Sequence, residues 1–103
     1  MEKNRLIELI IMTIALHYDV DQNVVLKGKK DTDTRECRDA IVYFLRIEMG
    51  LTFNEIGEIV NLDRSATGRA YKRALERNIN DKCFQVDVKR IKEKIKGYIR
   101  NSA

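Results

Sequence analysis

Basic and hydroxyl side chains recur on one face of a predicted helix in the second half of this chain. Stepping by about 100° per residue places Ser65, Arg69 and Lys72 on one side of the segment, and Thr67 and Ala70 on the opposite, apolar side. Arginine, lysine and serine donate hydrogen bonds to phosphates and to the edges of bases. The spacing therefore favours a helix that presents donors to DNA.

The segment before this face has the signals that would hold the helix in place. Thr52 and Glu55 have capping-box spacing, in which each side chain satisfies a free backbone N–H at a helix start. Asn61 tolerates the left-handed conformation that ends helices, and Asp63 is a good N-cap for the next helix. Two short helices joined by a three-residue turn form a helix-turn-helix, which we predict over about residues 52–77.

Two glycines and a leucine also fit the packing of two helices against each other. Gly57 lies where the two helices would cross, and Leu62 in the turn would enter the core. Glycine inside a helix costs roughly 1 kcal/mol relative to alanine, so Gly68 favours a close approach to a phosphate or to a neighbouring helix. A purely structural helical pair with a solvated basic face has similar features and remains the alternative.

The composition bounds the class of protein. A length of 103 residues fits one helical domain over residues 1–103. The net charge of +4 and the isoelectric point of about 9.2 favour an anionic partner. The chain has no proline and only five glycines, and its apolar residues recur at helical spacing. We therefore predict an all-α fold, a five- to six-helix cluster containing a helix-turn-helix.

Few side chains are available for catalysis or metal binding. His17 is the single histidine and we expect no cluster around it, and no carboxylate pair with a supporting constellation appears. We therefore expect no enzyme, no cofactor and no metal site. Cys37 and Cys83 have no CxxC partner, and we expect two free thiols in a reducing cytoplasm, with one disulfide as the alternative. Cys37 fits a core position.

Two long apolar segments lie in the first half of the chain. Residues 3–17 predict a largely buried helix, because Glu8 interrupts an apolar run that is too short to span a membrane. No cleavage site follows it, so it is not a signal peptide. Residues 34–49 predict a central helix that Gly50 ends.

Lysines surround the end of a short predicted helix between these segments. Asp21 would cap this helix and Gly28 would end it. Lys27, Lys29 and Lys30 could clamp a phosphate there. The acidic residues that follow weaken the positive field, so a solvated loop is an equal alternative.

The C-terminal segment predicts a last helix. Residues 78–81 predict a turn, and Asp81 would cap a helix over about 82–100. Its apolar stripe would pack on the same chain, with dimerisation as the alternative. The stripe consists of Val88, Ile91, Ile95 and Tyr98.

Over about residues 12–78 the chain resembles the C-terminal DNA-binding domain of the bacterial replication initiator DnaA. The segments that carry the resemblance are IALHYDVDQNVVLKGKK, ECRDAIVYFLRIEMGLTFNEIGEIV and DRSATGRAYKRAL. It implies a helix-turn-helix fold, also described as Trp-repressor-like, and docking on double-stranded DNA. Arg64, Ser65 and Ala66 stand where the family has a histidine and two threonines that read bases. The family's ATPase domain and its GxxxxGK[ST] segment do not occur here, so no nucleotide is expected.

The resemblance also assigns roles to individual residues. It implies that Arg64, Ser65, Arg69 and Lys72 enter or flank the major groove, that Lys27, Lys29, Lys30 and Arg38 contact phosphates, and that Asn54 helps to hold the backbone. Thr67 and Arg73 complete the predicted DNA-binding set. The expected function is sequence-specific DNA binding as a bacterial or phage transcriptional regulator or replication accessory protein. The alternative is a protein-interaction module that dimerises through its first or last helix.

Overall fold

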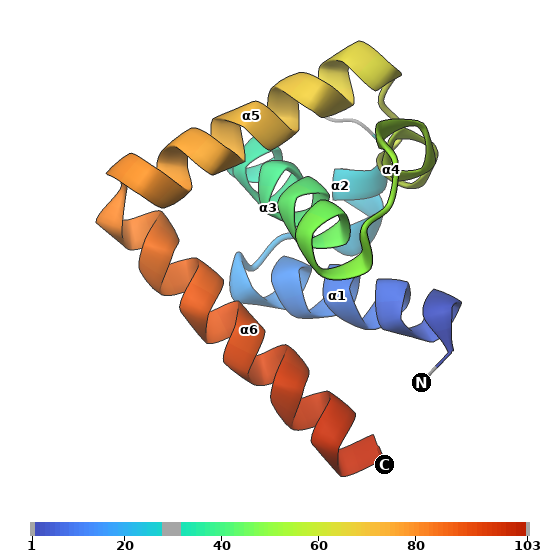
Figure 1. Cartoon of the computed structure of the whole chain (residues 1–103), viewed down its shortest axis with the longest axis vertical. Helices are drawn as coiled ribbons and strands as arrows, with labels where there is room; N and C mark the ends of the chain where they lie inside the picture. The colour runs from blue at the N-terminus through green and yellow to red at the C-terminus, as the bar shows by residue number, and fades with distance from the viewer. Residues whose placement is uncertain (1, 28–31, 103) are drawn as a thin grey trace.

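Six helices account for the regular structure of the described residues. The structure is a computed structural model that describes residues 2–27 and 32–102. All regular secondary structure in those two ranges is helical, so the predicted all-α fold is confirmed. The helices in chain order are α1 (Lys3–His17), α2 (Gln22–Leu26), α3 (Thr32–Met49), α4 (Phe53–Val60), α5 (Arg64–Asn80) and α6 (Lys82–Ser102) (Figure 1).

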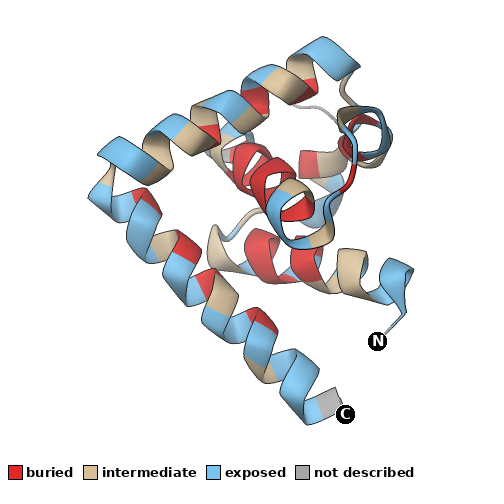
Figure 2. Cartoon of the chain, viewed as in Figure 1, coloured by how far each residue is buried: buried red, intermediate tan, exposed pale blue. Residues whose placement is uncertain are grey.

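Helix α3 lies at the centre of the molecule and packs against α1, α2, α4 and α5. Residues 40–45 are buried on every side of the helix, as the red ribbon in Figure 2 shows. The predicted apolar face is therefore part of a wider buried surface, because neighbouring helices also cover Val42 and Tyr43. The helix ends before Gly50, whose φ of +64° lies in the left-handed region that glycine adopts without strain.

The predicted caps of α4 and α5 are present. The Thr52 hydroxyl accepts a hydrogen bond from the Glu55 N–H at 3.1 Å, and the Glu55 carboxylate accepts one from the Thr52 N–H at 3.0 Å. These bonds lower the pKa of Glu55. Asn61 ends α4 with φ 60° and ψ 48°, and Asp63 accepts a bond from the Ala66 N–H at 2.7 Å. Local sequence signals therefore determine both ends of this turn.

Gly57 of α4 faces the turn and the first part of α5, in agreement with the predicted crossing of the two helices. A Cβ atom there would lie 2.4 Å from the Leu62 carbonyl oxygen and 3.0 Å from Thr67 Oγ1. Leu62 is half-buried against the core. A Cβ atom at Gly68 would instead meet the Phe53 ring at 3.8 Å, an ordinary contact. The structure therefore requires glycine at position 57 and tolerates a methyl group at position 68.

The prediction of a turn over residues 78–81 is wrong. Helix α5 continues to Asn80, and the break is confined to Asp81. The Asn78 side chain donates a hydrogen bond to the Tyr43 hydroxyl at 3.1 Å, a tertiary contact that keeps this residue in the helix. Asp81 caps α6 as predicted, because its carboxylate accepts bonds from the Cys83 and Phe84 N–H groups at 2.9 and 3.2 Å.

Helix α6 contacts α5 and α1, so its apolar stripe covers its own chain as predicted. Val88, Ile91 and Ile95 are buried, together with Phe84, which the predicted stripe did not include. Tyr98 is 45% exposed, so the prediction that it belongs to the buried stripe is wrong. The last turns of α6 are largely exposed (Figure 2).

The apolar helix α1 buries one side and exposes another. Ile10, Ile14 and Ala15 are in the core, whereas Met12 and Leu16 are 39% and 69% exposed. Within residues 2–27 and 32–102, none of the helices combines the length and apolar character needed to cross a membrane.

Candidate nucleic-acid interface

The outer face of α5 presents the donors that the sequence predicted. Arg64, Ser65, Arg69 and Lys72 are all exposed. Ser65, Arg69 and Lys72 are spaced four and three residues apart, so they form one row about 10.5 Å long. In the described ranges these four side chains have no ion-pair or hydrogen-bond partner, so their donors are available to a ligand.

The inner face of α5 is fixed to α3 and α4. Its Arg73 guanidinium donates two hydrogen bonds of 2.9 Å to the carboxylate of Asp39 on α3. Tyr71 contacts the ring of Phe53 on α4, with 5.6 Å between centroids, and stacks on Tyr43 of α3 at 6.2 Å. These contacts hold the exposed row rigidly on the core, which is how a recognition surface avoids an ordering cost on binding.

Two residues predicted to contact DNA are buried, and that prediction is wrong for them. Thr67 has no exposed surface, and its hydroxyl donates to the Asp63 carbonyl oxygen at 2.8 Å. Arg38 is 5% exposed, and its Nε and Nη2 donate to the Val25 carbonyl oxygen at 3.1 and 3.0 Å. Thr67 lies on the apolar side of α5, which packs against the core. The Arg38 side chain links α3 to α2 through its hydrogen bonds.

Arg73 is a third residue of the predicted DNA-binding set whose side chain is engaged inside the protein. Its side chain is 36% exposed, while that of its partner Asp39 is only 5% exposed. The hydrogen bonds to Asp39 raise the pKa of Arg73. Releasing Arg73 to bind a phosphate would leave the Asp39 carboxylate buried without its charge partner. We therefore assign Arg73 to positioning α5.

Asn54 of α4 and Arg64 of α5 face the same depression at the start of the candidate interface. Both line an open depression of about 520 Å³ formed by α4 and the turn. Glu58 and Asp63 line the same depression, so it is of mixed charge rather than a purely basic pocket. Asn54 is exposed, as a contact to a DNA backbone would require.

The predicted lysine clamp lies mostly outside the described residues. Lys27 is exposed and forms the C-cap of α2, with its N–H donating to the Asn23 carbonyl at 3.1 Å. Gly28, Lys29 and Lys30 fall in the range 28–31, outside the described residues. The clamp therefore remains a prediction.

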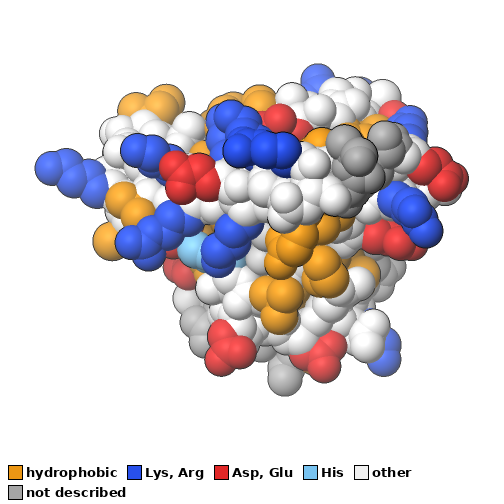
Figure 3. All heavy atoms as spheres, turned by 90° about the horizontal axis from the view of Figure 1, so that it is seen from below, with side chains coloured by type: hydrophobic (Ala, Val, Ile, Leu, Met, Phe, Trp, Pro, Cys, Tyr) orange, Lys and Arg blue, Asp and Glu red, His pale blue; other side chains and the backbone are white. Residues whose placement is uncertain are grey.

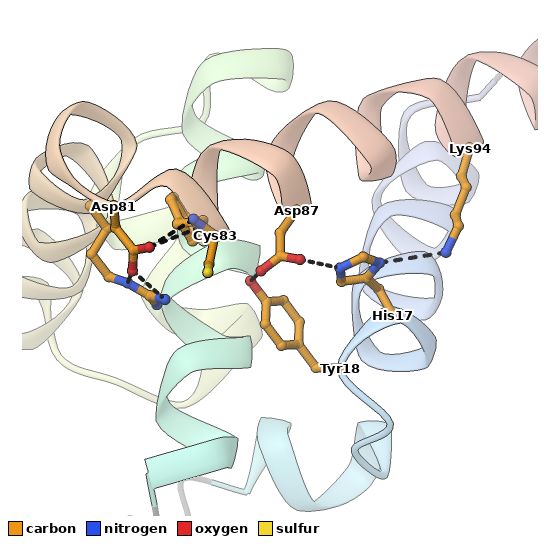
Figure 4. Close-up of polar contacts among 8 residues, drawn as sticks. His17, Tyr18, Asp81, Cys83, Asp87 and Lys94 are labelled. Atoms are coloured by element: carbon orange, nitrogen blue, oxygen red, sulfur yellow. Dashed lines mark hydrogen bonds and ion pairs between the residues drawn. The ribbon is translucent and has the colours of Figure 1, made fainter.

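The sequence did not reveal a polar cluster around His17, and the expectation that none exists is wrong. The His17 Nε2 lies 2.8 Å from a carboxylate oxygen of Asp87 on α6, and Tyr18 donates its hydroxyl hydrogen to the other oxygen at 3.4 Å (Figure 4). Lys94 Nζ approaches the His17 Nδ1 at 3.5 Å. Burial and then the charge of Asp87 raise the pKa of the Tyr18 phenol, so it stays protonated and donates.

This cluster connects α1 to α6 across 70 residues of sequence. Both ring nitrogens of His17 have partners, Asp87 at Nε2 and Lys94 at Nδ1. A structural tie between the two helices explains this arrangement.

Neither the thiols nor the acidic groups of the described residues form a metal site. Cys37 and Cys83 are both free, and burial raises the pKa of the Cys37 thiol to about 12, so it is an inert core residue as predicted. Across residues 2–27 and 32–102, no three histidine, cysteine or acidic side chains are grouped so that they could hold a metal ion.

Comparison with known proteins gives no family for the chain. No protein-family profile matches the sequence, and no curated protein is significantly similar to it. The resemblance to the DnaA C-terminal domain therefore rests on the quoted segments alone, and function has to be argued from the surface itself.

Proposed function

We propose that this chain binds double-stranded DNA in a sequence-specific manner, with α4 and α5 acting as a helix-turn-helix and without catalysis. The observation that carries the proposal is the division of α5 into two faces. Ser65, Arg69 and Lys72 form an exposed row of donors, while Thr67 and Ala70 are completely buried behind it. A recognition helix needs such a row near its N-terminal half, where it meets base edges and phosphates.

Each exposed side chain suits a distinct contact. Arg69 lies in the middle of the row and can donate two hydrogen bonds to O6 and N7 of one guanine. Ser65 can donate to or accept from a base edge in the first turn. Lys72 and Arg64 lie at the ends of the surface and can bind the phosphates that flank the groove.

The biological role that fits this activity is transcriptional regulation or assistance in replication. The DnaA-like segments support it, since the second of them includes α4 and the third includes Asp63 and most of α5. The side chains that would read bases differ from those of that family, so the preferred DNA sequence should differ as well.

The test is a binding selection on random duplex DNA at one fixed salt concentration. The intact protein should enrich a defined sequence, and Arg69→Ala should lose preference for at least one base pair of it. Arg5→Ala is the matched control, because Arg5 is also exposed but lies on α1. A selection that enriches nothing with the intact protein would exclude sequence-specific binding.

Exposed apolar side chains on α1 favour a second candidate, a protein-interaction module. Met12 and Leu16 are four residues apart and both exposed, so they lie on one outward side of the helix. Figure 3, which views the molecule from below, shows hydrophobic side chains gathered beside lysines and arginines. Sedimentation of the intact protein and of Leu16→Ser distinguishes the two. The interaction module is favoured if the intact protein is a dimer that binds no duplex, and if Leu16→Ser is a folded monomer.

A further inference from the structure

The positive charge of the chain is concentrated in its last two helices. Helix α6 holds seven Lys or Arg residues and two acidic residues, and α5 holds five and one. Since the net charge of the whole chain is +4, the remainder is net negative. The proposed recognition surface uses the charge of α5 and leaves that of α6 without a role.

Five basic residues of α6 lie on the outer side of the helix. Lys82, Lys89 and Lys96 follow one another at seven-residue intervals, about 10.5 Å apart along the axis. Arg90 and Arg100 lie beside this row, and all five side chains are exposed. Within the part of the chain that the structure describes, none of them has an ion-pair or hydrogen-bond partner.

Three other charged residues of α6 are directed toward the protein. Lys92 pairs with Glu48 of α3 at 4.0 Å, and Lys94 contacts His17. Asp87 is turned toward α1, where it accepts from His17 and Tyr18. Glu93 is thus the exposed acid among the outer lysines.

We propose that the outer face of α6 is a second, sequence-independent surface that binds the phosphate backbone of duplex DNA. A row of exposed lysines matches a regular polyanion, because lysine binds phosphate as a point charge without a required geometry. A membrane surface fits less well. An interfacial helix inserts a continuous apolar face, and the α6 stripe of Phe84, Val88 and Ile91 is already buried in the core. The exposed apolar side chains of α6 form no such face, because Val86 lies about three turns before Tyr98 and Ile99.

This surface meets a different stretch of DNA from the α5 row. Figure 1 shows α5 and α6 diverging from a corner near Asp81, with the start of α5 at the far end. Arg64 lies about 24 Å along the helix axis from Asn80. The inference extends the proposed DNA binding but rests on other residues, so the two can fail separately.

The experiment compares Lys89→Gln/Lys96→Gln with the control Lys3→Gln/Arg5→Gln, which removes the same charge from exposed positions of α1. Anisotropy with a random-sequence duplex gives the affinity at several salt concentrations. We expect the α6 variant to bind about tenfold more weakly at low salt and to lower the salt slope by about 1.8, because each lost phosphate contact removes about 0.9. The control should stay within about twofold of the intact protein.

A third variant, Arg69→Ala/Lys72→Ala, separates the two surfaces. If it loses sequence preference but keeps most of its affinity for random duplex, α6 acts on its own. If it loses all duplex binding, or if the α6 variant matches its control, the α6 proposal is overturned and the α5 proposal stands. Binding to phosphatidylserine vesicles that depends on Lys89 and Lys96, without binding to duplex, would overturn the assignment to DNA. Circular dichroism confirms that each variant is folded.

Discussion

Alanine at the two glycines of the α4–α5 pair should have opposite effects on stability. Gly57→Ala places a methyl group 2.4 Å from the Leu62 carbonyl oxygen and 3.0 Å from Thr67 Oγ1. Gly68→Ala places one 3.8 Å from the Phe53 ring. Both positions are in helices, so the gain in helix propensity is the same and the difference reports the local packing.

The magnitudes follow from these distances. Non-bonded carbon–oxygen contacts are ordinarily at least about 3.3 Å, so Leu62 must retreat by roughly 0.9 Å in Gly57→Ala. Leu62 also donates its N–H to the Gly57 carbonyl at 2.9 Å, and this bond would be strained by the shift. Overpacking costs about 1–3 kcal/mol and can exceed the propensity gain of roughly 1 kcal/mol. We expect Gly57→Ala to lose about 2 kcal/mol and Gly68→Ala to gain about 0.5–1 kcal/mol.

Thermal and urea unfolding followed by circular dichroism measure both effects. For a protein of this size, 1 kcal/mol corresponds to roughly 5 °C in Tm. Gly57→Ala should therefore melt about 10 °C lower than the intact protein and Gly68→Ala a few degrees higher. Equal or greater stability of Gly57→Ala would refute the close approach of the turn to α4. If Gly68→Ala is more stable but binds DNA less well, the glycine serves the DNA contact.

Three further substitutions test the contacts between helices. Arg73→Ala should cost roughly 2–3 kcal/mol in urea unfolding because Asp39 stays buried without its partner, and an unchanged midpoint would disprove this positioning role. The hydrogen bond from the Phe84 N–H, together with the Arg77 contact, holds the pKa of Asp81 below its usual value of 3.8. The stability that Asp81 contributes is therefore present above that pH and is lost as the pH falls through the lowered pKa. Asp81→Asn should flatten the fall of Tm in acid, and parallel curves of Tm against pH for the two proteins would contradict this. Ile95→Asp should destabilise the monomer by about 3 kcal/mol or more, whereas a stable folded monomer from a dimeric parent would make α6 an interface.

The turn between α4 and α5 was predictable because its determinants are local. The Thr52–Glu55 box, the left-handed Asn61 and the Asp63 cap each act within three residues. Gly57 was predictable for the same reason, since its close neighbour Leu62 is five residues away. Short-range hydrogen bonds of this kind leave a clear pattern in the sequence.

The roles of the arginines were not predictable from short stretches of sequence. Arg73 is held by Asp39, 34 residues away, and Arg38 by the Val25 carbonyl, 13 residues away. An arginine at a helical position has the same pattern whether it meets a phosphate or an internal acceptor. Thr67 is different, because its helical phase already placed it on the apolar side of α5, and this signal was the better guide to its burial.

Long-range polar contacts explain the other discrepancies. His17 and Asp87 are 70 residues apart, and only the packing of α6 on α1 brings them together. Asparagine is common in turns, yet Asn78 lies in α5, where its side chain donates a hydrogen bond to the Tyr43 hydroxyl. In each case the partner is fixed by the fold, so no local pattern contains it.

The most direct test of DNA recognition by α5 is the affinity of the intact protein and of Arg69→Ala for two duplexes at the same salt. One duplex carries the sequence enriched by selection and the other a scrambled version of it, and Arg5→Ala serves as the control. We predict that Arg69→Ala loses roughly 1–3 kcal/mol on the selected duplex and much less on the scrambled one, while Arg5→Ala changes neither. Equal losses on both duplexes, or no preference by the intact protein, would contradict the claim that α5 reads sequence.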